Sequence, residues 1–343
     1  MKSTRHRALG SLLALAFLSG CFNSAPWNTP ALQLWKTDGT SAGAAFVRRF
    51  PMRLEWNWLA PVALGDQVLF TLTDGRQGVE LWRSDGSVDG TVKVVDLSPG
   101  KAEVGGVGPV PDAVLAVGKT LFFTFADGVH GPELWKTDGT AEGTGLVKDI
   151  LPGSEGSFPR QFARLGHRLL FFVDADPAAL WSSDGTPEGT VQIAVASWSL
   201  GASAVVGDAL LYREGESSDE TNALWRSDGT ARGTTRVGDF PVGPANCVAA
   251  RGLLFCDVLG ELWTSDGTAE KTRRVTAVQG LQSDSLIAAG QRVYFATATD
   301  GKDRQLWTSD GTAEGTLSVA SFPDLGAQAF GAGFARGEPT DLT

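Results

Sequence analysis

Few residues in this chain have the type and spacing that acid–base catalysis or metal binding requires. Three histidines occur among the 343 residues. His6 lies in an N-terminal segment of different composition, whereas His130 and His167 fall in predicted turns of different repeats, where exposed polar residues are common. We therefore expect no histidine-based triad, no metal site and no cofactor.

Neighbouring carboxylates are the other candidates for chemistry, because Asp and Glu together number 39. Asp174 with Asp176, and Asp219 with Glu220, are such pairs. Two carboxylates on either side of a glycosidic bond can act as acid and as nucleophile or base. Neighbours in sequence do not by themselves flank a substrate, so exposed acidic loops are the simpler interpretation. The chain is not predicted to be an enzyme.

Three tryptophans stand in irregular segments between repeats. Trp56 and Trp58 lie in an insertion before the second repeat, and Trp198 lies in another connection. Aromatic rings at such rim positions can stack on sugars or anchor a protein partner. Additional packing between repeats is the favoured interpretation, and rim binding is the alternative.

Seven copies of one short motif organise the rest of the chain. The third copy is the clearest and runs Glu133-Leu134-Trp135-Lys136-Thr137-Asp138-Gly139-Thr140. The motif recurs about every 45 residues, which is in the range of four-stranded propeller blades. Its tryptophans, predicted to pack between blades, are Trp35, Trp82, Trp135, Trp181, Trp225, Trp263 and Trp307. Its aspartates, predicted to shape a turn, are Asp38, Asp85, Asp138, Asp184, Asp228, Asp266 and Asp310.

One repeat contains signals for four short strands. Between Pro111 and Ile150, apolar runs are separated by Gly118 and by Asp127-Gly128, both typical of turns. Consecutive apolar residues such as Leu121-Phe122-Phe123 indicate a sheet that is covered on both faces. The sequence therefore predicts an all-β protein, a seven-bladed β-propeller of four-stranded antiparallel blades.

The two ends of the repeat region are incomplete in complementary ways. Leu34 to Phe50 supplies only the third and fourth strands of a blade, and Ala327 to Gly337 resembles a first strand. Pairing of the N- and C-terminal segments would close the ring and remove exposed sheet edges. The missing second strand leaves two alternatives: the closing blade has three strands, or residues 22–33 complete it.

The motif resembles the ELWxxDGT repeat family of bacterial surface proteins. The copies depart from the family pattern at the first Glu, which is replaced in four of them, and Lys271 replaces the second Gly. The family name describes a repeat and implies no activity. A side chain needed for chemistry would not be missing from four of seven copies, so these glutamates are not expected to be catalytic. Each turn also offers a single acidic side chain, too few for a dedicated calcium site. The four replacements are Gln33, Ala179, Ala223 and Gln305.

The N-terminal segment has the layout of an export signal. Basic residues precede an apolar run from Leu9 to Leu18, which is too short to span a bilayer as a helix. Leu18-Ser19-Gly20-Cys21 resembles the lipobox of bacterial lipoproteins, and the resemblance implies lipidation of Cys21. Phe22 then favours the outer membrane, and an ordinary signal peptide is the alternative. The expected organisation is 1–21 signal peptide, 22–33 linker and 34–343 propeller.

The charge and the fold class together give the functional expectation. A net charge of -10 disfavours nucleic acid as a partner. We expect an exported monomer, attached to the membrane by an N-terminal lipid, that acts as a non-catalytic binding module for an unknown envelope protein or glycan. The alternatives are a carbohydrate-active enzyme with carboxylates in the central funnel, and an envelope assembly scaffold.

Cys247 and Cys256 flank a predicted hairpin. If Arg251-Gly252 is a two-residue turn, Ala250 faces Leu253 and the two cysteines face each other as a non-hydrogen-bonded pair. Opposed Cα atoms about 4.5 Å apart lie at the short end of the disulfide range, and an exported protein can be oxidised. The register predicts a disulfide, with two buried free thiols as the alternative.

Overall fold

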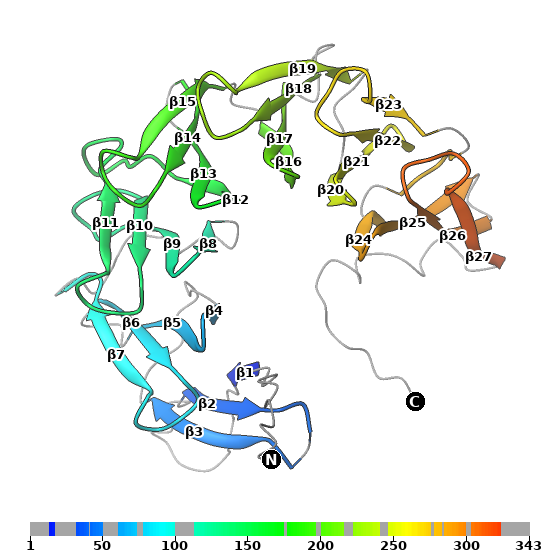
Figure 1. Ribbon diagram of the computed structural model, residues 1–343. Coiled ribbons are helices and arrows are strands. Elements are labelled where there is room, and N and C mark those ends of the chain that lie inside the picture. Colours follow the sequence, from blue (N-terminus) through cyan, green and yellow to red (C-terminus); the bar gives the residue numbers. More distant parts are fainter. Residues whose placement is uncertain are drawn as a thin grey trace, which may run out of the picture. The chain divides into compact units, whose positions relative to one another are not determined.

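The computed structural model describes residues 14–17, 32–40, 42–50, 61–73, 78–99, 113–174, 177–196, 200–215, 222–240, 246–275, 278–282, 285–299 and 303–323. Its elements are the strands β1 to β27, which form seven antiparallel sheets in chain order (Figure 1). Contacts divide the chain into two units, Met1–Phe162 with Gly185–Pro187, and Ala163–Asp184 with Glu188–Thr343. The predicted all-β class and the blade architecture of a β-propeller are confirmed.

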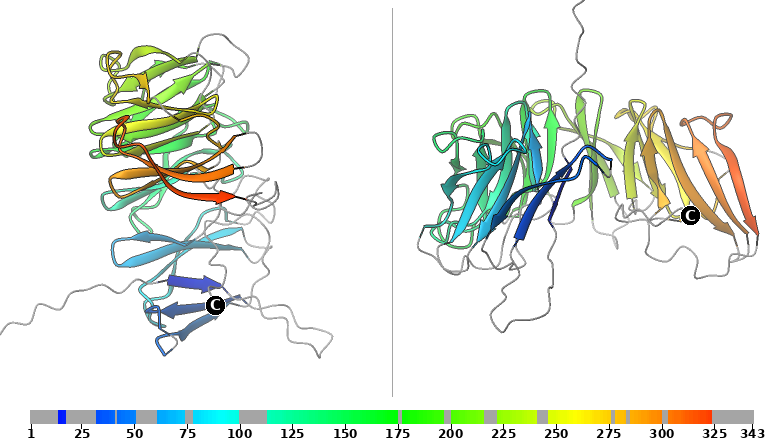
Figure 2. Two further views of the ribbon diagram at one scale, coloured as in Figure 1. Left: turned by 90° about the vertical axis from the view of Figure 1, so that its right-hand side faces the viewer. Right: turned by 90° about the horizontal axis from the view of Figure 1, so that it is seen from below.

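Within every sheet, neighbouring strands are also neighbours in sequence, so each blade is a meander (Figure 2). The first sheet has three described strands, β1 (Ala14–Phe17), β2 (Leu32–Thr37) and β3 (Ala45–Phe50). The second has β4 (Val62–Leu64), β5 (Gln67–Thr73), β6 (Val79–Ser84) and β7 (Val92–Asp96). The third has β8 (Val114–Val117), β9 (Thr120–Phe125), β10 (Glu133–Thr137) and β11 (Gly145–Lys148).

The remaining four sheets have four strands each. They consist of β12 (Arg160–Leu165), β13 (Arg168–Val173), β14 (Ala179–Ser183) and β15 (Val191–Val195), then β16 (Leu200–Val206), β17 (Ala209–Glu214), β18 (Asn222–Ser227) and β19 (Thr235–Phe240). The last two consist of β20 (Asn246–Ala250), β21 (Leu253–Val258), β22 (Glu261–Ser265) and β23 (Arg273–Arg274), then β24 (Ile287–Ala289), β25 (Arg292–Thr299), β26 (Asp303–Ser309) and β27 (Leu317–Pro323).

The apolar core lies between successive sheets. In the first unit Phe50 of one sheet meets Phe70 of the next edge to face, with ring centroids 6.0 Å apart. In the second unit Phe172 and Tyr212 make the same kind of contact at 5.2 Å. Every residue from Leu121 to Phe125 of β9 is buried. The predicted covering of the second strands on both faces is therefore confirmed.

The third strand of six of the seven sheets carries an irregularity that the sequence did not reveal. Where β10 pairs with β11, the register shifts between Leu134 and Trp135. The same shift between Leu and Trp occurs in five other blades. A bulge of this kind bends a strand and increases its twist, so a repeated bulge gives the blades a common curvature.

Basic side chains after two of the tryptophans tie neighbouring sheets together in the first unit. Arg83 Nη1 donates a hydrogen bond to the carbonyl of Gly139 at 3.1 Å. Lys136 Nζ donates to the carbonyl of Gly185 at 2.7 Å. In both cases the acceptor is the turn glycine of the following motif copy, so the turn of one blade is held by the third strand of the blade before it.

The first sheet differs from the expectation for its missing strand. Residues 14–17, placed by the sequence inside the export signal, form β1 and pair with β2, with Ala16 opposite Trp35. This is the position that Phe70 and Phe123 occupy opposite Trp82 and Trp135 in the next blades. A short apolar segment thus satisfies the free edge of β2. Residues 22–31 and 327–337 lie outside the described residues, and pairing of the chain ends stays a prediction.

Candidate functional site

The repeated aspartates are bonded within their own turns. Asp138 Oδ1 accepts hydrogen bonds from the Thr140 backbone N–H at 2.9 Å and from its hydroxyl at 2.7 Å. Thr140 Oγ1 in turn accepts from the N–H of Gly143 at 3.0 Å. The Thr140 hydroxyl and backbone bonds hold the pKa of Asp138 below its usual value. Equivalent bonds to the aspartate occur at Asp38, Asp85, Asp228, Asp266 and Asp310, while Asp184 also has a bonding partner.

A close approach explains the second glycine of the motif. A Cβ atom on Gly143 would overlap the carboxylate of Asp138. The same overlap would occur at five other copies, Gly43, Gly90, Gly189, Gly233 and Gly315. In the sixth copy Lys271 stands at this position, and its ammonium pairs with Asp266 Oδ2 at 2.8 Å. The turn aspartates therefore shape the backbone, and the Oδ1 atom of each of the six bonded in this way is occupied within its own turn.

The buried glutamate of the third copy has a structural role. Glu133 is fully buried, and its carboxylate accepts bonds from the backbone N–H groups of Ile150, Leu151 and Ser157 and from the Ser157 hydroxyl at 2.6 Å. Burial raises the pKa of Glu133 above its usual value. Both oxygens hold the loop that follows β11, so this carboxylate fixes a connection between blades.

The motif tryptophans lie at the margins of the clusters between sheets. Trp135 is the most buried of them and is 9 % exposed, and it contacts Phe125 with centroids 5.4 Å apart. The others are partly buried, and several pack against core clusters. Most of the largest fully buried side chains are instead on the second strands, among them Phe70, Phe123 and Phe171.

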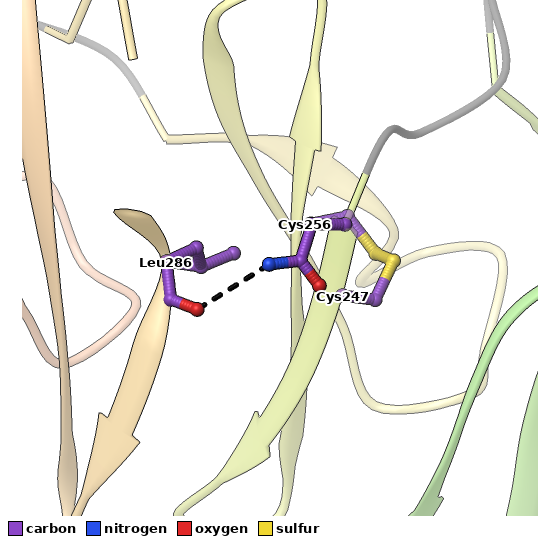
Figure 3. Close-up of a disulfide and its surroundings, with 4 residues drawn as sticks. Cys247, Cys256 and Leu286 are labelled. Carbon is purple, nitrogen blue, oxygen red and sulfur yellow. Dashed lines mark hydrogen bonds between the residues drawn. A yellow bond between two sulfur atoms is a disulfide. The ribbon is translucent and has the colours of Figure 1, made fainter. Parts of the chain in front are cut away.

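The two cysteines of the sixth blade form a disulfide, which Figure 3 shows beside Leu286. Cys247 faces Cys256 in the predicted register, and Ala250 faces Leu253 across the two-residue turn. Their Cα atoms are 4.2 Å apart. Asn246 Nδ2 donates to the Leu286 carbonyl at 3.4 Å, which links this hairpin to the segment entering the seventh blade.

Several predicted residues do not come together in a catalytic group. His130 Nδ1 lies 3.0 Å from Asp127 Oδ2, whereas His167 is exposed in the turn between β12 and β13. The part of the chain that the structure describes holds no group of three or more His, Cys, Asp or Glu side chains that could bind a metal ion. It also holds no helix with the length and apolarity needed to cross a membrane. The predictions for seven residues lie outside the described part of the chain, namely those for Cys21, Trp56, Trp58, Trp198, Asp176, Asp219 and Glu220.

A pocket that the sequence did not indicate lies between the sixth and seventh blades, inside the second unit. It has a volume of about 380 Å³, which is within the range of small-molecule sites. Its buried lining consists of Val275, Val278 and Thr297, with the partly buried ring of Trp307. Its polar lining consists of Glu261, Arg274, Gln279 and Gln305.

The polar groups of this pocket differ from their equivalents in the second blade. There, Glu80 uses one oxygen for the indole N–H of Trp82 at 2.9 Å and the other for Lys93 Nζ at 2.9 Å. In the sixth blade Arg274 occupies the position of Lys93, opposite the motif tryptophan. Glu261 Oε1 accepts from Arg274 Nη1 at 2.7 Å, while Glu261 Oε2 has no hydrogen-bond partner among the described residues.

In the seventh blade a second polar group of the pocket, the Gln305 amide, lacks the bond to tryptophan that its equivalent makes. Gln305 occupies the motif position from which Gln33 accepts the indole N–H of Trp35 at 3.0 Å. In the seventh blade Thr297 Oγ1 accepts the Trp307 N–H instead, at 3.0 Å. Within the described part of the chain the Gln305 amide therefore keeps its donors and its acceptor available. Thr297 is the residue that could have signalled this site in the sequence, because the equivalent positions in four other copies are apolar, namely Leu72, Phe125, Val173 and Val258.

Seven consecutive antiparallel meanders, six of them with a bulge at the same place in the third strand, put the chain in the β-propeller class. No protein-family model and no curated protein matches it. Similar solved structures include puromycin hydrolase, with a TM-score of 0.44 and 14% identity over 86% of this chain and 51% of that chain. A mutant of puromycin hydrolase complexed with PGG has a TM-score of 0.43 and 16% identity over 86% and 50%. A structure from a study of two prolyl endopeptidases has a TM-score of 0.37 and 10% identity over 78% and 50%.

These comparisons require one correction. The structures named above are of a hydrolase and of prolyl endopeptidases, and the chain spans about half of their length. The finding contradicts the expectation of a non-catalytic binding module for an envelope protein or glycan, which is withdrawn with its two alternatives. It does not test export, lipidation of Cys21 or attachment to the membrane, which stay predictions. What the chain shares with these proteins is the fold.

Proposed function

We propose that the protein binds a small polar molecule in the pocket between β22 and β26. The observation that supports this function is the meeting of available polar groups, Glu261 Oε2 and the Gln279 and Gln305 amides, above a buried apolar lining. Ligand sites commonly combine a concave apolar surface with a few polar groups that fix orientation. Strands β22 and β26 hold Glu261 and Gln305, which keeps this part of the site formed before a ligand enters, whereas Gln279 lies in the connection between β23 and β24.

The energetics favour a ligand over a purely structural role for these groups. Glu261 and Arg274 have side chains that are 30% and 51% exposed, so their ion pair contributes little to stability. A Gln305 amide without a partner in the described residues contributes no hydrogen bond to the fold. A ligand would supply the missing partners, and burial of its apolar part against Trp307 and Val278 would add a hydrophobic contribution.

Calorimetric titration of the full chain with a panel of amino acids, short peptides, nucleosides and monosaccharides tests this function. At least one panel member should bind, and Gln305→Leu should weaken its affinity. Gln33→Leu, at the same motif position in the first blade and outside the pocket, should leave the affinity unchanged. Binding that survives Gln305→Leu, or a panel in which no member binds, would contradict the proposed site.

A further inference from the structure

We propose that the ligand of this pocket is a zwitterionic α-amino acid with an apolar side chain, a conclusion that rests on the function proposed above. Its carboxylate would bind Arg274, its ammonium would bind Glu261, and its side chain would contact Trp307 and Val278. The inference comes from the pairing of charges at the pocket, from the two amides beside them, and from the apolar lining below.

The pocket contains one ion pair, between Arg274 and Glu261. Arg274 Nη1 and Glu261 Oε1 are 2.7 Å apart, so the pocket presents one positive and one negative group side by side. Arg274 keeps Nε and Nη2, and Glu261 keeps Oε2, without hydrogen-bond partners in the described part of the chain. A ligand with a single charge would satisfy one member and desolvate the other, which costs free energy. An α-amino acid carries both charges on one carbon and satisfies both members.

Because Arg274 and Glu261 are both partly exposed, turning them from each other toward a ligand costs little free energy. Because the two side chains are 51% and 30% exposed, water screens their attraction and either can reorient toward a ligand. A guanidinium group offers several donors in a plane that matches a carboxylate. Arg274 can therefore bind a ligand carboxylate while it still contacts Glu261.

The amides and the apolar lining define the rest of the ligand. Gln279 and Gln305 each provide donors and an acceptor, which suit the remaining bonds of a carboxylate and an ammonium group. Val275 and Val278 are 4% and 3% exposed, and together with the ring of Trp307 they form the apolar part of the pocket lining. The bond of Trp307 to Thr297 fixes the indole ring, so its polar atom does not compete for the ligand. A side chain that is aliphatic or aromatic fits this part of the pocket.

Titration of the full chain with L-phenylalanine, its N-acetyl derivative and its C-terminal amide tests the assignment. Removing either charge of the ligand should weaken binding at least tenfold. In Glu261→Gln the amino acid and its N-acetyl derivative should bind alike, and in Arg274→Met the amino acid and its amide should bind alike. Lys93→Met is the matched control, because it removes the equivalent ion pair of the second blade outside the pocket, and it should leave all three affinities unchanged.

The outcomes separate this inference from the function on which it rests. If a monosaccharide or nucleoside binds in the pocket and L-phenylalanine and L-leucine do not, the amino-acid assignment is wrong and the small-molecule site stands. If the N-acetyl derivative and the amide bind more weakly than L-phenylalanine by the same factor in wild type and in both variants, Glu261 and Arg274 do not bind the charged groups of the ligand. The assignment is then also wrong. If no molecule of the panel binds, the site and the assignment both fail.

Discussion

In six of the seven copies, the turn aspartate and the glycine five residues after it act as one steric unit. The carboxylate of Asp138 lies where a Cβ atom of residue 143 would be, because Oδ1 is held by two bonds from Thr140. The glycine is needed here for space, whereas Gly139, at a φ of 87°, is needed for its backbone conformation. Two glycines of one motif are therefore fixed by two different physical requirements.

The need for a residue without a Cβ atom at position 143 can be measured by comparing substitutions of Gly143 and Gly145. Gly143→Ala should lower the free energy of unfolding by about 1–3 kcal/mol, the usual cost of overpacking. Gly145→Ala is the matched control, because its Cβ would meet no atom within 4 Å. Chemical denaturation of both variants checks this expectation, and equal losses would show that the carboxylate moves aside without cost.

The pair of His130 and Asp127 should make stability depend on pH. The hydrogen bond that His130 Nδ1 donates to Asp127 Oδ2 raises the pKa of His130 above its usual value. The folded state therefore favours the protonated ring, and this contribution is present below about pH 6.5 and is lost as the pH rises through the raised pKa. His130→Ala should cost about 0.2–1 kcal/mol near pH 5, as partly exposed ion pairs do, and little near pH 9.

Denaturation curves of wild type and His130→Ala at both pH values test this assignment. Asp127→Asn should remove most of the same pH-dependent difference, since it removes the negative charge that favours the protonated ring. A His130→Ala effect that is constant from pH 5 to pH 9 would contradict a role for the protonated ring.

At the scale of the element, the blade depends on its second strand and on the tryptophan that faces it. Trp135 lies opposite Phe123 and contacts Phe125, and it is the most buried of the motif tryptophans. Trp135→Ala should therefore cost about 3–5 kcal/mol, the range for truncation of a large buried aromatic side chain.

Chemical denaturation checks this loss, with Val129→Ala as the control. Val129 is 63% exposed in the turn between β9 and β10, so its truncation should change stability by less than about 0.5 kcal/mol. Small and equal effects of the two substitutions would show that the repeated tryptophan is not part of the packing between sheets.

The strands themselves could be read from the sequence because their signals are local. Leu121 to Phe125 is a continuous apolar run next to a glycine turn, and it became β9. The bulge at Leu134 and Trp135 could not be read, because it depends on the register with a strand that begins ten residues later. The pocket was missed for a related reason. Arg274 and Glu261 lie in the sixth sheet and Thr297 and Gln305 in the seventh, and only the packing of the two sheets brings these four residues around one pocket.

At the scale of the whole molecule, the single described disulfide acts on a short loop. Cys247 and Cys256 are nine residues apart, so their bond removes little conformational freedom from the unfolded chain. Reduction should lower the free energy of unfolding by about 2–3 kcal/mol and leave the fold intact. Denaturation with and without a reducing agent checks this, with thiol counting to verify the state, and global unfolding on reduction would contradict it.

The repetition of one aspartate turn has a consequence for the behaviour of the molecule in acid. Six turn aspartates have a lowered pKa, held down by hydrogen bonds from Thr, Ser or Lys side chains, and they are Asp38, Asp85, Asp138, Asp228, Asp266 and Asp310. Between the usual aspartate pKa, about 4, and the lowered values, the folded state binds fewer protons than the unfolded chain. The stabilisation is thus present above that range and is lost below it. Because six equivalent groups titrate together, acid unfolding takes up several protons in one step, and the same repeat that builds the blades makes the loss of structure in acid steep.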